Sequence, residues 1–332
     1  MAALSGDVLV VNAGSTSLKL SVVRPGESSA GVDSLAEAPA DVSAVAHRVV
    51  HGGARFREPV VVDAAVRAEL DSLSELAPLH NVPALAAIDE ARRALRGVPH
   101  VAVFDTAFHA TILDEAATYA IPERWREWGI RRYGFHGLSV QWCSERVRAP
   151  RLVVCHLGGG SSVTAVRDGR SIDTTMGFSP LEGVPMTTRS GSLDPGALLY
   201  LLREHGVGAE QLDHALEFES GMKALGGGSG DMREVRDLAL DVFTYRVAAA
   251  IAAMAVALDG LDALAFTAGI GENSALVRAR VCGRLGFLGV ELDERASENA
   301  RAGSVISRGH VEVHVVRARE ELVAARAALT VV

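Results

Sequence analysis

Two stretches of the chain share one pattern of hydrophobic and polar positions. In residues 8–23 and again in residues 152–167, an apolar run enters a short turn of Gly, Ser and Asn or His, and a second strand-like run leaves it. This pattern predicts two β-hairpins whose tips are too small and flexible to serve packing. Two hairpins of one kind, far apart in the chain, predict two related domains that face one nucleotide across a cleft.

The tips of both hairpins suit an anion, because glycines let backbone N–H groups converge and hydroxyl side chains add donors. The residues concerned are Gly14, Ser15, Thr16 and Ser17 in the first tip and Gly158, Gly159, Gly160, Ser161 and Ser162 in the second. A plain turn is the alternative. However, Lys19 follows the first tip and is one of only two lysines in the chain, which favours a phosphate site. The Gly-Lys dipeptide of a P-loop is absent from the sequence.

The rest of the pattern alternates strands and helices. Short apolar runs predict buried strands at 42–50, 101–104, 263–267 and 311–316. Helical spacing predicts helices at 63–76, 83–95, 107–117, 139–148, 212–223 and 319–330. A long buried helix is expected from Met232 to about Leu258, with Asp231 as its cap. Residues 77–81 (APLHN) are expected to form a loop that carries His80, and residues 174–195 a long functional loop.

Composition restricts the classes of function. A length of 332 residues predicts two domains, each able to bury its own core. A formal net charge of −8 with dispersed basic residues argues against a nucleic-acid groove. The three cysteines form no C-x-x-C pair, which indicates reduced thiols and a cytoplasmic protein. The N-terminus has no signal-peptide pattern, and the longest apolar run, 247–258, is too short to span a membrane.

Several polar residues stand where ligands usually bind. Arg48 lies inside an apolar strand, where a guanidinium is costly to bury unless it pairs with an acid across the sheet or faces a polar cleft. Asp105 follows a strand, at the edge where open α/β sheets bind ligands, although it could instead cap the next helix. Phe135 and His136 lie between two glycines on a bent backbone, and Arg189 is the one arginine of the long loop.

Eleven short motifs, in order along the chain, resemble the acetate kinase family of short-chain carboxylate kinases. They are VVNAGSTSLK, HRVVHGG, APLHN, VFDTAFH, RYGFHG, HLGGGSS, MGFSPLEG, MTTRSG, GDMRE, FTAGIGENS and the EEL of the tail. The resemblance implies an α/β fold of the actin-like, hexokinase-like ATPase group, with two ribonuclease-H-like domains and a central cleft. The N-terminal domain would comprise residues 1–106 and 319–332. The C-terminal domain, with the nucleotide site, would comprise residues 107–318.

The same resemblance implies reversible phosphoryl transfer from ATP to acetate, which gives acetyl phosphate and ADP. It implies Mg²⁺ as the metal, for which Mn²⁺ could substitute, and a homodimer formed through the second domain. It places catalysis at Arg48, Asp105, His136 and Arg189, with His136 and Arg189 stabilising the transition state.

The resemblance also assigns binding residues. The substrate would contact Arg48, Val50, Leu79, Phe135 and Pro180, and His80 occupies the position of a second family histidine. The nucleotide would contact Asn12, Ser15, Ser17, Lys19, His156, Gly158, Gly159, Gly160, Asp231, Met232, Arg233, Gly269, Ile270 and Asn273. The metal would be held by Asn12 and Glu320, with Asp105 close to it.

Three departures from the family pattern leave alternatives open. The family usually has Asn in the middle of the second tip, where this chain has Gly159. Before the tail acids it usually has Pro-Thr-Asn, where this chain has Arg-Ala-Arg, so Glu321 is an alternative to Glu320. The chain is also shorter than typical members, mostly between residues 20 and 42. A propionate or butyrate kinase of the same group, or a nucleotide-binding relative without catalysis, therefore remains an alternative.

Overall fold

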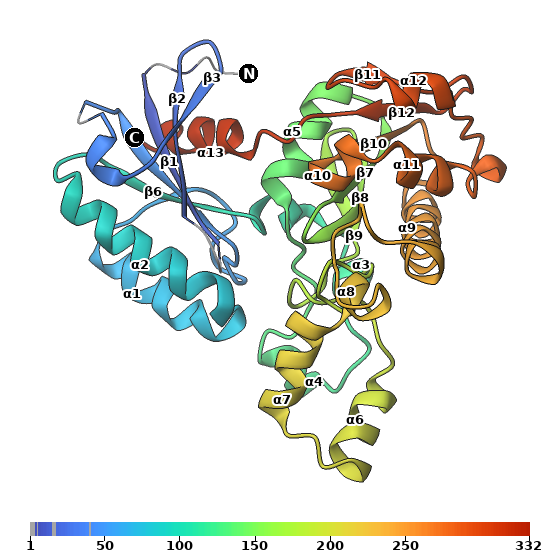
Figure 1. Ribbon diagram of the computed structural model, residues 1–332. Helices are drawn as coiled ribbons and strands as arrows, with labels where there is room; N and C mark the ends of the chain where they lie inside the picture. Colours follow the sequence, from blue (N-terminus) through green and yellow to red (C-terminus); the bar gives the residue numbers. More distant parts are fainter. Residues whose placement is uncertain (1–3, 5, 15–17, 40) are drawn as a thin grey trace. The chain divides into compact units, whose positions relative to one another are not determined.

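The computed structural model describes residues 4, 6–14, 18–39 and 41–332, which form two compact units. Unit 1 comprises Met1–Ala110, Phe135–Trp142 and Arg319–Val332, and unit 2 comprises Thr111–Gly134 and Cys143–Ala318 (Figure 1). The sequence led us to expect residues 135–142 in the second domain. They belong to unit 1 because the turn before them is bonded to the end of its sheet: Gly137 N donates to Asp105 O at 2.9 Å.

Unit 1 is built on a six-stranded mixed sheet in the order β3-β2-β1-β4-β6-β5. The strands are β1 (Val8–Ala13), β2 (Leu18–Arg24), β3 (Ser28–Val32), β4 (Ala44–Val49), β5 (Val60–Val61) and β6 (His100–Phe104). The first three form an antiparallel meander, which confirms the first predicted hairpin. β4 and β6 run parallel to β1, and β5 pairs antiparallel with β6 at the edge.

Alternation along β4 gives the two faces of the strand different neighbours. Val45 and Val49 belong to apolar clusters that include residues of α2 (Pro78–Ala94). Arg48 points to the opposite face, where Glu320 of α13 (Glu320–Leu329) approaches it. Because successive side chains of a strand point to opposite faces, Arg48 can stand in an apolar strand without entering the core under α2. The other helices of unit 1 are α1 (Ala64–Ser72), η1 (Leu35–Glu37), η2 (Leu73–Leu76) and η3 (Ala107–Thr111).

Unit 2 repeats the topology of unit 1. Its six strands are β7 (Arg151–Leu157), β8 (Ser161–Arg167), β9 (Arg170–Thr174), β10 (Ala263–Thr267), β11 (Ser304–Val305) and β12 (Glu312–Val315), in the order β11-β12-β10-β7-β8-β9. As in unit 1, an antiparallel meander is followed by two parallel strands and an antiparallel edge strand. The second hairpin and the α/β fold of two related domains are thereby confirmed.

The helices of unit 2 lie around this sheet and in an extension from it (Figure 1). They are α3 (Asp114–Ala117), α4 (Glu123–Glu127), α6 (Pro195–Glu204), α7 (Ala209–His214), η4 (Ala215–Glu219), α8 (Gly221–Leu225), α9 (Asp237–Leu258), α10 (Ala268–Asn273), α11 (Ala275–Cys282), η5 (Gly286–Leu288) and α12 (Glu294–Glu298). α5 (Gly137–Val147) starts in unit 1 and ends in unit 2.

The long helix α9 is buried on one face only. Phe243, Val247 and Ile251 belong to the core cluster of unit 2. Leu238, Tyr245 and Val256 are exposed, so the expectation of a wholly buried helix is wrong for the outer face. Among the described residues, α9 is the one helix that is long and apolar enough to cross a membrane, and 50% of its apolar window is buried. A core helix passes the same test, so this is a weak indication of a span.

Two further expectations about helices are wrong. Residues 78–81 are the first turn of α2 and not a loop, because Pro78 occupies the first helical positions, where a missing N–H costs nothing. Asp231 does not cap α9, which begins at Asp237 after Arg236; its carboxylate instead accepts hydrogen bonds from Arg233.

The helix expected over residues 212–223 is interrupted. It is divided into α7, the π-helical turn η4 and α8. The break falls where Ser220 is extended and Gly221 has a φ of +64°, a conformation that glycine adopts readily.

Two buried histidines link the stability of unit 1 to pH. Nε2 of His47, on β4, lies 2.9 Å from Nδ1 of His100, on the neighbouring strand β6. Burial, together with the charges of His100 and Arg92, lowers the pKa of His47 to about 3, and burial also lowers that of His100. A histidine in the unfolded chain has a pKa of about 6.5. The unfolded chain therefore binds more protons below that pH, and folding stability is lost as pH falls from about 6.5 towards 3.

We expect His47→Gln to reduce this acid loss, because a Gln amide keeps a donor near His100 but does not titrate. Urea unfolding between pH 6.5 and pH 4 should show a loss smaller by roughly 1 to 3 kcal/mol than in the wild type. The surface variant His205→Gln should leave the pH dependence unchanged. Equal pH dependence in wild type and His47→Gln would contradict the assignment.

Candidate active site

Arg48 is the centre of a hydrogen-bonded cluster at the carboxyl ends of the unit 1 strands. Its Nε donates to Oδ1 of Asp105 at 2.9 Å and its Nη2 to Oδ2 at 2.5 Å, a two-point contact that matches the planar guanidinium. Nη1 donates to Oδ1 of Asn12 at 3.1 Å and lies 3.7 Å from Oε2 of Glu320. The structure thus brings four of the expected site residues together.

Charge and burial fix the ionisation of this cluster. The side chain of Asp105 is 1% exposed and that of Arg48 is 19% exposed. Burial disfavours the charged guanidinium, but the charges of Asp105 and Glu320 outweigh it and raise the pKa of Arg48. Arg48 is therefore a permanent cation held by an acid at the end of the neighbouring strand. Removal of one partner from such a buried pair typically costs about 3 to 5 kcal/mol.

The oxygen atoms around Arg48 suit a magnesium ion. Mg²⁺ binds carboxylate and amide oxygens and keeps several waters, and Asn12 and Glu320 supply such oxygens. Both carboxylate oxygens of Asp105 already accept hydrogen bonds from Arg48, so Asp105 is better suited to bind a water of the metal. Among the described residues there is no group of three or more acids, cysteines or histidines that could hold a metal.

The first hairpin tip is only partly described. Ser15, Thr16 and Ser17 lie outside the described residues. Lys19 lies opposite Asn12 in the register of β1 and β2 and is exposed. The two residues therefore belong to the same end of one hairpin.

His136 occupies a strained turn beside Asp105. Its φ is +60°, in the left-handed region that costs a residue with a side chain about 1 to 2 kcal/mol. The turn is followed by Gly137, where a Cβ atom would lie 2.1 Å from the carbonyl oxygen of Asp105. Glycine at 137 thus permits the close approach that brings the His136 turn against the end of β6.

The expected substrate residues belong to different units of the chain. Val50, Leu79 and Phe135 belong to unit 1, whereas Pro180 is in unit 2. In unit 1 the backbone of His51 exchanges two hydrogen bonds of 3.1 Å with the side chain of Asn81, and its ring lies 5.4 Å from that of Phe135. His80 lies beside Asn81 in the first turn of α2. Asn81 is buried and was not singled out from the sequence, although it ends the APLHN motif.

Unit 2 contains a pocket of about 710 Å³ that collects most of the expected nucleotide residues. A pocket of this size suits a drug-sized or nucleoside-sized ligand. The lining residues that were expected from the sequence are Gly158, Gly159, Asp231, Met232, Arg233, Gly269, Ile270 and Asn273. Thr187, Gly230 and Ser274 also line it and were not predicted, although each lies within or beside a quoted motif. His156 and Gly160 adjoin the same hairpin tip but are not among the residues that line the pocket.

Two features of this pocket bear on ligand binding. Hydrogen bonds from Arg233 lower the pKa of Asp231 to about 2, so its carboxylate is an acceptor at neutral pH. Gly159, where the family resemblance led us to expect Asn, has no atom within 4 Å of an added Cβ and no positive φ. Its backbone can face a phosphate, and a side chain at 159 would meet no steric obstacle.

Arg189 lies in the irregular segment between β9 and α6. Its Nε donates to Oε2 of Glu217 at 2.5 Å, and Glu217 is buried in the turn η4. Backbone hydrogen bonds join this segment to η4 and α8: Ser190 N donates to Leu216 O at 3.2 Å and Met222 N to Met186 O at 2.9 Å. Glu217 was missed in the sequence because nothing in its local pattern indicates a partner nearly thirty residues away.

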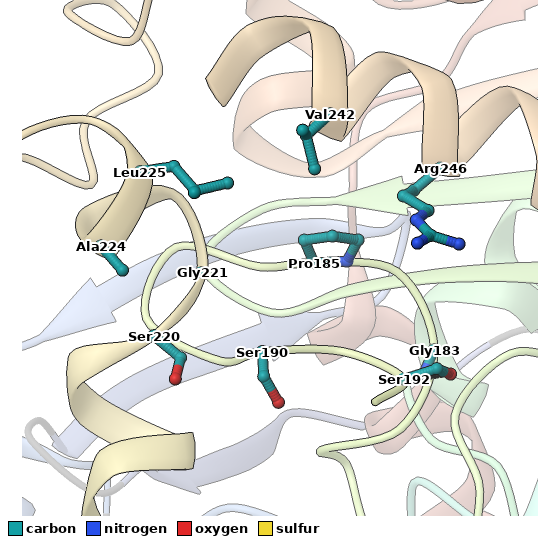
Figure 2. A pocket seen from close by; sticks show the side chains of 10 residues that line it. All are labelled: Gly183, Pro185, Ser190, Ser192, Ser220, Gly221, Ala224, Leu225, Val242 and Arg246. Atoms are coloured by element: carbon teal, nitrogen blue, oxygen red, sulfur yellow. Dashed lines mark hydrogen bonds between the residues drawn. The ribbon is translucent and has the colours of Figure 1, made fainter. Parts of the chain in front are cut away.

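A smaller pocket of about 290 Å³ adjoins the Arg189 segment. Figure 2 shows Pro185, Leu225 and Val242 among the residues that line it, together with Arg246 from α9, Gly183 and Ser192. Ser190 and Gly221 also line it. The Arg189 segment is therefore supported by bonds to η4 and α8 and borders a partly open space.

Comparison with known proteins identifies the family to which the chain belongs. A sequence model described as the Acetokinase family matches residues 28–326. The chain belongs to this family. The acetate kinase of Protochlamydia amoebophila (strain UWE25) is 46% identical over 306 residues, which cover 87% of this chain and 77% of that protein. The acetate kinase of Deinococcus deserti (strain DSM 17065) is 49% identical over 308 residues, with 86% and 77% covered.

Solved structures agree with the acetokinase assignment. A propionate kinase from Francisella tularensis superposes with a TM-score of 0.89 at 32% identity, covering 98% of this chain and 100% of that one. The acetate kinase of Porphyromonas gingivalis gives a TM-score of 0.87 at 30% identity, with 98% and 100% covered. The fold of this chain is therefore that of the solved acetate and propionate kinases.

The support of the Arg189 segment can be tested at Gly221. A Cβ atom at this position would lie 2.2 Å from Met186 O and 2.7 Å from Arg189 O, and the φ of +64° is unfavourable for alanine. We expect Gly221→Ala to lower the free energy of unfolding by roughly 2 to 4 kcal/mol and to reduce turnover. Gly227→Ala is the matched control, because Gly227 has a φ of +72° but no atom near its added Cβ. Equal losses in urea unfolding of the two variants would refute the role of Gly221.

Proposed function

We propose that this member of the Acetokinase family catalyses the reversible transfer of the γ-phosphoryl group of ATP to acetate, which gives acetyl phosphate and ADP. The observation that carries the proposal is the cluster of Asn12, Arg48, Asp105 and Glu320 in a chain that is 46% identical to an acetate kinase over most of its length. A nucleotide-binding relative without catalysis would have no need to keep this cluster intact.

Unit 2 would bind the nucleotide. The pocket between the second hairpin tip and α10 is large enough for adenosine. The backbone N–H of Gly159 would face the phosphates, since that of Gly158 donates to Gly160 O at 3.0 Å. The ionised carboxylate of Asp231 would accept hydrogen bonds from the nucleoside. Met232 and Ile270 supply apolar contacts for a base. The residues around the tip would thus fix the direction of the phosphate chain.

Unit 1 would bind the carboxylate. Acetate is already ionised near neutral pH, so its oxygen can attack the γ-phosphorus without a general base. As the new O–P bond forms, the bond from the γ-phosphorus to the bridging oxygen of ADP breaks. Arg48 would orient the carboxylate, while Val50, Leu79 and Phe135 would contact the methyl group. Asp105 keeps the guanidinium of Arg48 charged and fixed in one plane.

Arg189 and His136 would stabilise the transferring group. Phosphoryl transfer passes through a loose transition state with charge on three equatorial oxygens, so positioning and electrostatics supply most of the catalysis. An arginine that acts on this state is worth about 10³ to 10⁵ in rate in related enzymes. Glu217, which bonds to Nε of Arg189, would orient its guanidinium as Asp105 orients that of Arg48.

Mg²⁺ is the proposed metal, and Mn²⁺ could take its place. Asn12 and Glu320 would hold the ion with its waters, and Asp105 would bind one of those waters. When bound, the metal would neutralise phosphate charge. Glu321 is less suited, because it bonds to Arg319 and to Ser29.

Propionate is the second candidate substrate, because the Francisella protein with a TM-score of 0.89 is described as a propionate kinase. The expected substrate contacts are apolar side chains, and one methylene in such a pocket is worth only about 1 to 3 kcal/mol. Mixed use of acetate, propionate and butyrate is therefore consistent with the same residues.

We also propose a cytoplasmic homodimer with neither a nucleic-acid nor a membrane partner. The three cysteines are buried free thiols, as a reducing compartment permits. In unit 2, α6 buries none of its side chains and exposes Leu199, Tyr200 and Leu202, and α9 exposes Val256. Apolar exposure of this kind is typical of an interface. Sedimentation equilibrium that shows only monomer at micromolar concentration would refute the dimer.

The activity is tested with purified protein, Mg-ATP and acetate, propionate or butyrate in a coupled ADP assay and a hydroxamate assay. We expect turnover with acetate, and Arg189→Ala should lower kcat by about 10³-fold or more. The Kd for ADP, measured by calorimetry, should change far less, because Arg189 acts on the transferring group. No turnover on any of the three acids would overturn the proposed function, and equal effects on kcat and Kd would overturn the role of Arg189.

A further inference from the structure

The turn that carries His136 is fixed on both sides by groups next to Asp105. On one side, Nε2 of His109 lies 2.8 Å from the carbonyl oxygen of Phe135. On the other, Gly137 N donates to the carbonyl oxygen of Asp105 at 2.9 Å. His109 stands in η3, four residues after Asp105. Both bonds therefore join the turn to the segment that directly follows β6. All of these residues belong to unit 1.

The bond from His109 reaches the peptide that determines the conformation of His136. The carbonyl of Phe135 belongs to the peptide group that precedes His136, and rotation of that group changes the φ of His136. The observed φ of +60° is in a region that residues with a side chain rarely adopt. A donor fixed in the core therefore helps to hold a backbone that would otherwise relax to a commoner conformation.

His109 is suited to be a fixed neutral donor. Its side chain is buried, with the residue only 4% exposed. Burial lowers the pKa of His109 to about 4, although the carbonyl of Phe135 and the charge of Asp105 oppose this. Because a carbonyl oxygen only accepts hydrogen bonds, Nε2 carries the hydrogen of the neutral ring. The donor is therefore present throughout the neutral pH range.

We propose that His109 is a positioning residue, which sets the direction of the His136 imidazole by donating from Nε2 to the carbonyl oxygen of Phe135. This inference rests on the proposed function, in which His136 contacts the transferring phosphoryl group. His109 itself touches no reacting atom; it acts through the backbone. The same bond also fixes Phe135, whose ring lies 5.4 Å from that of His51 in the proposed substrate pocket.

Three replacements of His109 separate the hydrogen bond from packing. In Gln the amide nitrogen can take the place of Nε2, whereas the shorter Asn cannot reach it, and Phe fills the volume without a donor. We expect His109→Phe and His109→Asn to lower kcat by about 10- to 100-fold, as misplacement of a catalytic group by about 1 Å does. The KM for ATP should stay within about twofold, and His109→Gln should recover most of the rate.

A second background tests whether the effect passes through His136. In a His136→Ala enzyme, His109→Phe should lower kcat by no more than about twofold, since contacts that act as a unit are not additive. His100→Phe is the matched control: His100 is also a buried histidine of unit 1, its Nε2 lies 3.3 Å from Leu95 O, and it stands at the other end of β6. It should lower stability without lowering kcat.

A spectroscopic measurement keeps this inference separate from the proposed function. The imidazole Cε1–H signal of His136, assigned by its loss in His136→Ala, should shift in His109→Phe and His109→Asn but not in His109→Gln or His100→Phe. A wild-type enzyme without turnover would overturn the proposed function, whereas the NMR shifts would still report on positioning. An unmoved His136 signal, equal rate losses in both backgrounds, or a Gln variant as slow as the Asn variant would overturn the role of His109. If His109→Phe does not fold, the Asn and Gln pair gives the same comparison.

Discussion

The two-point ion pair between Arg48 and Asp105 is the interaction on which the proposed active site depends. A guanidinium within an apolar strand would destabilise the sheet unless a carboxylate met it. Asp105, at the end of the adjacent parallel strand, supplies that carboxylate, and the backbone of the same residue accepts the hydrogen bond that places the His136 turn. One residue at the end of β6 thus orients both the cation and the histidine of unit 1.

The two units use the same topology for different tasks. In each, the first strand of the antiparallel meander lies beside a parallel strand. In unit 1 the polar residues at the strand ends form the Arg48 cluster, whereas in unit 2 the second tip borders a nucleoside-sized pocket. Each unit also has an arginine whose Nε donates to a carboxylate: Arg48 to Asp105 in unit 1 and Arg189 to Glu217 in unit 2. We infer that each guanidinium is held by a carboxylate before a substrate arrives, which lowers the cost of ordering it.

Much of this arrangement could be predicted from the sequence, because it depends on local patterns. Both hairpins and the strand around Arg48 follow from short stretches of chain, whereas the pocket residues in the GDMRE and FTAGIGENS motifs were expected from the family resemblance. The failures have a physical cause as well. Pro83 suggested a helix start, although Pro78 already provides one, and Asp231 suggested a cap, although a neighbouring arginine takes its carboxylate. Glu217, Asn81 and His109 were missed because their roles arise from tertiary contacts that no local spacing reveals.

The most direct measurement is kcat/KM for acetate in Arg48→Lys, together with the Kd for ADP. Lysine keeps the positive charge but carries its three N–H donors on one nitrogen, so it cannot meet Asp105 through two parallel bonds while a separate nitrogen faces a substrate carboxylate. We expect kcat/KM for acetate to fall by about 100-fold or more, since a guanidinium fork is not replaceable at such a site. The Kd for ADP should stay within about threefold, because its pocket lies in the other unit. A lysine enzyme with near wild-type kcat/KM would contradict the central role of the Arg48 fork.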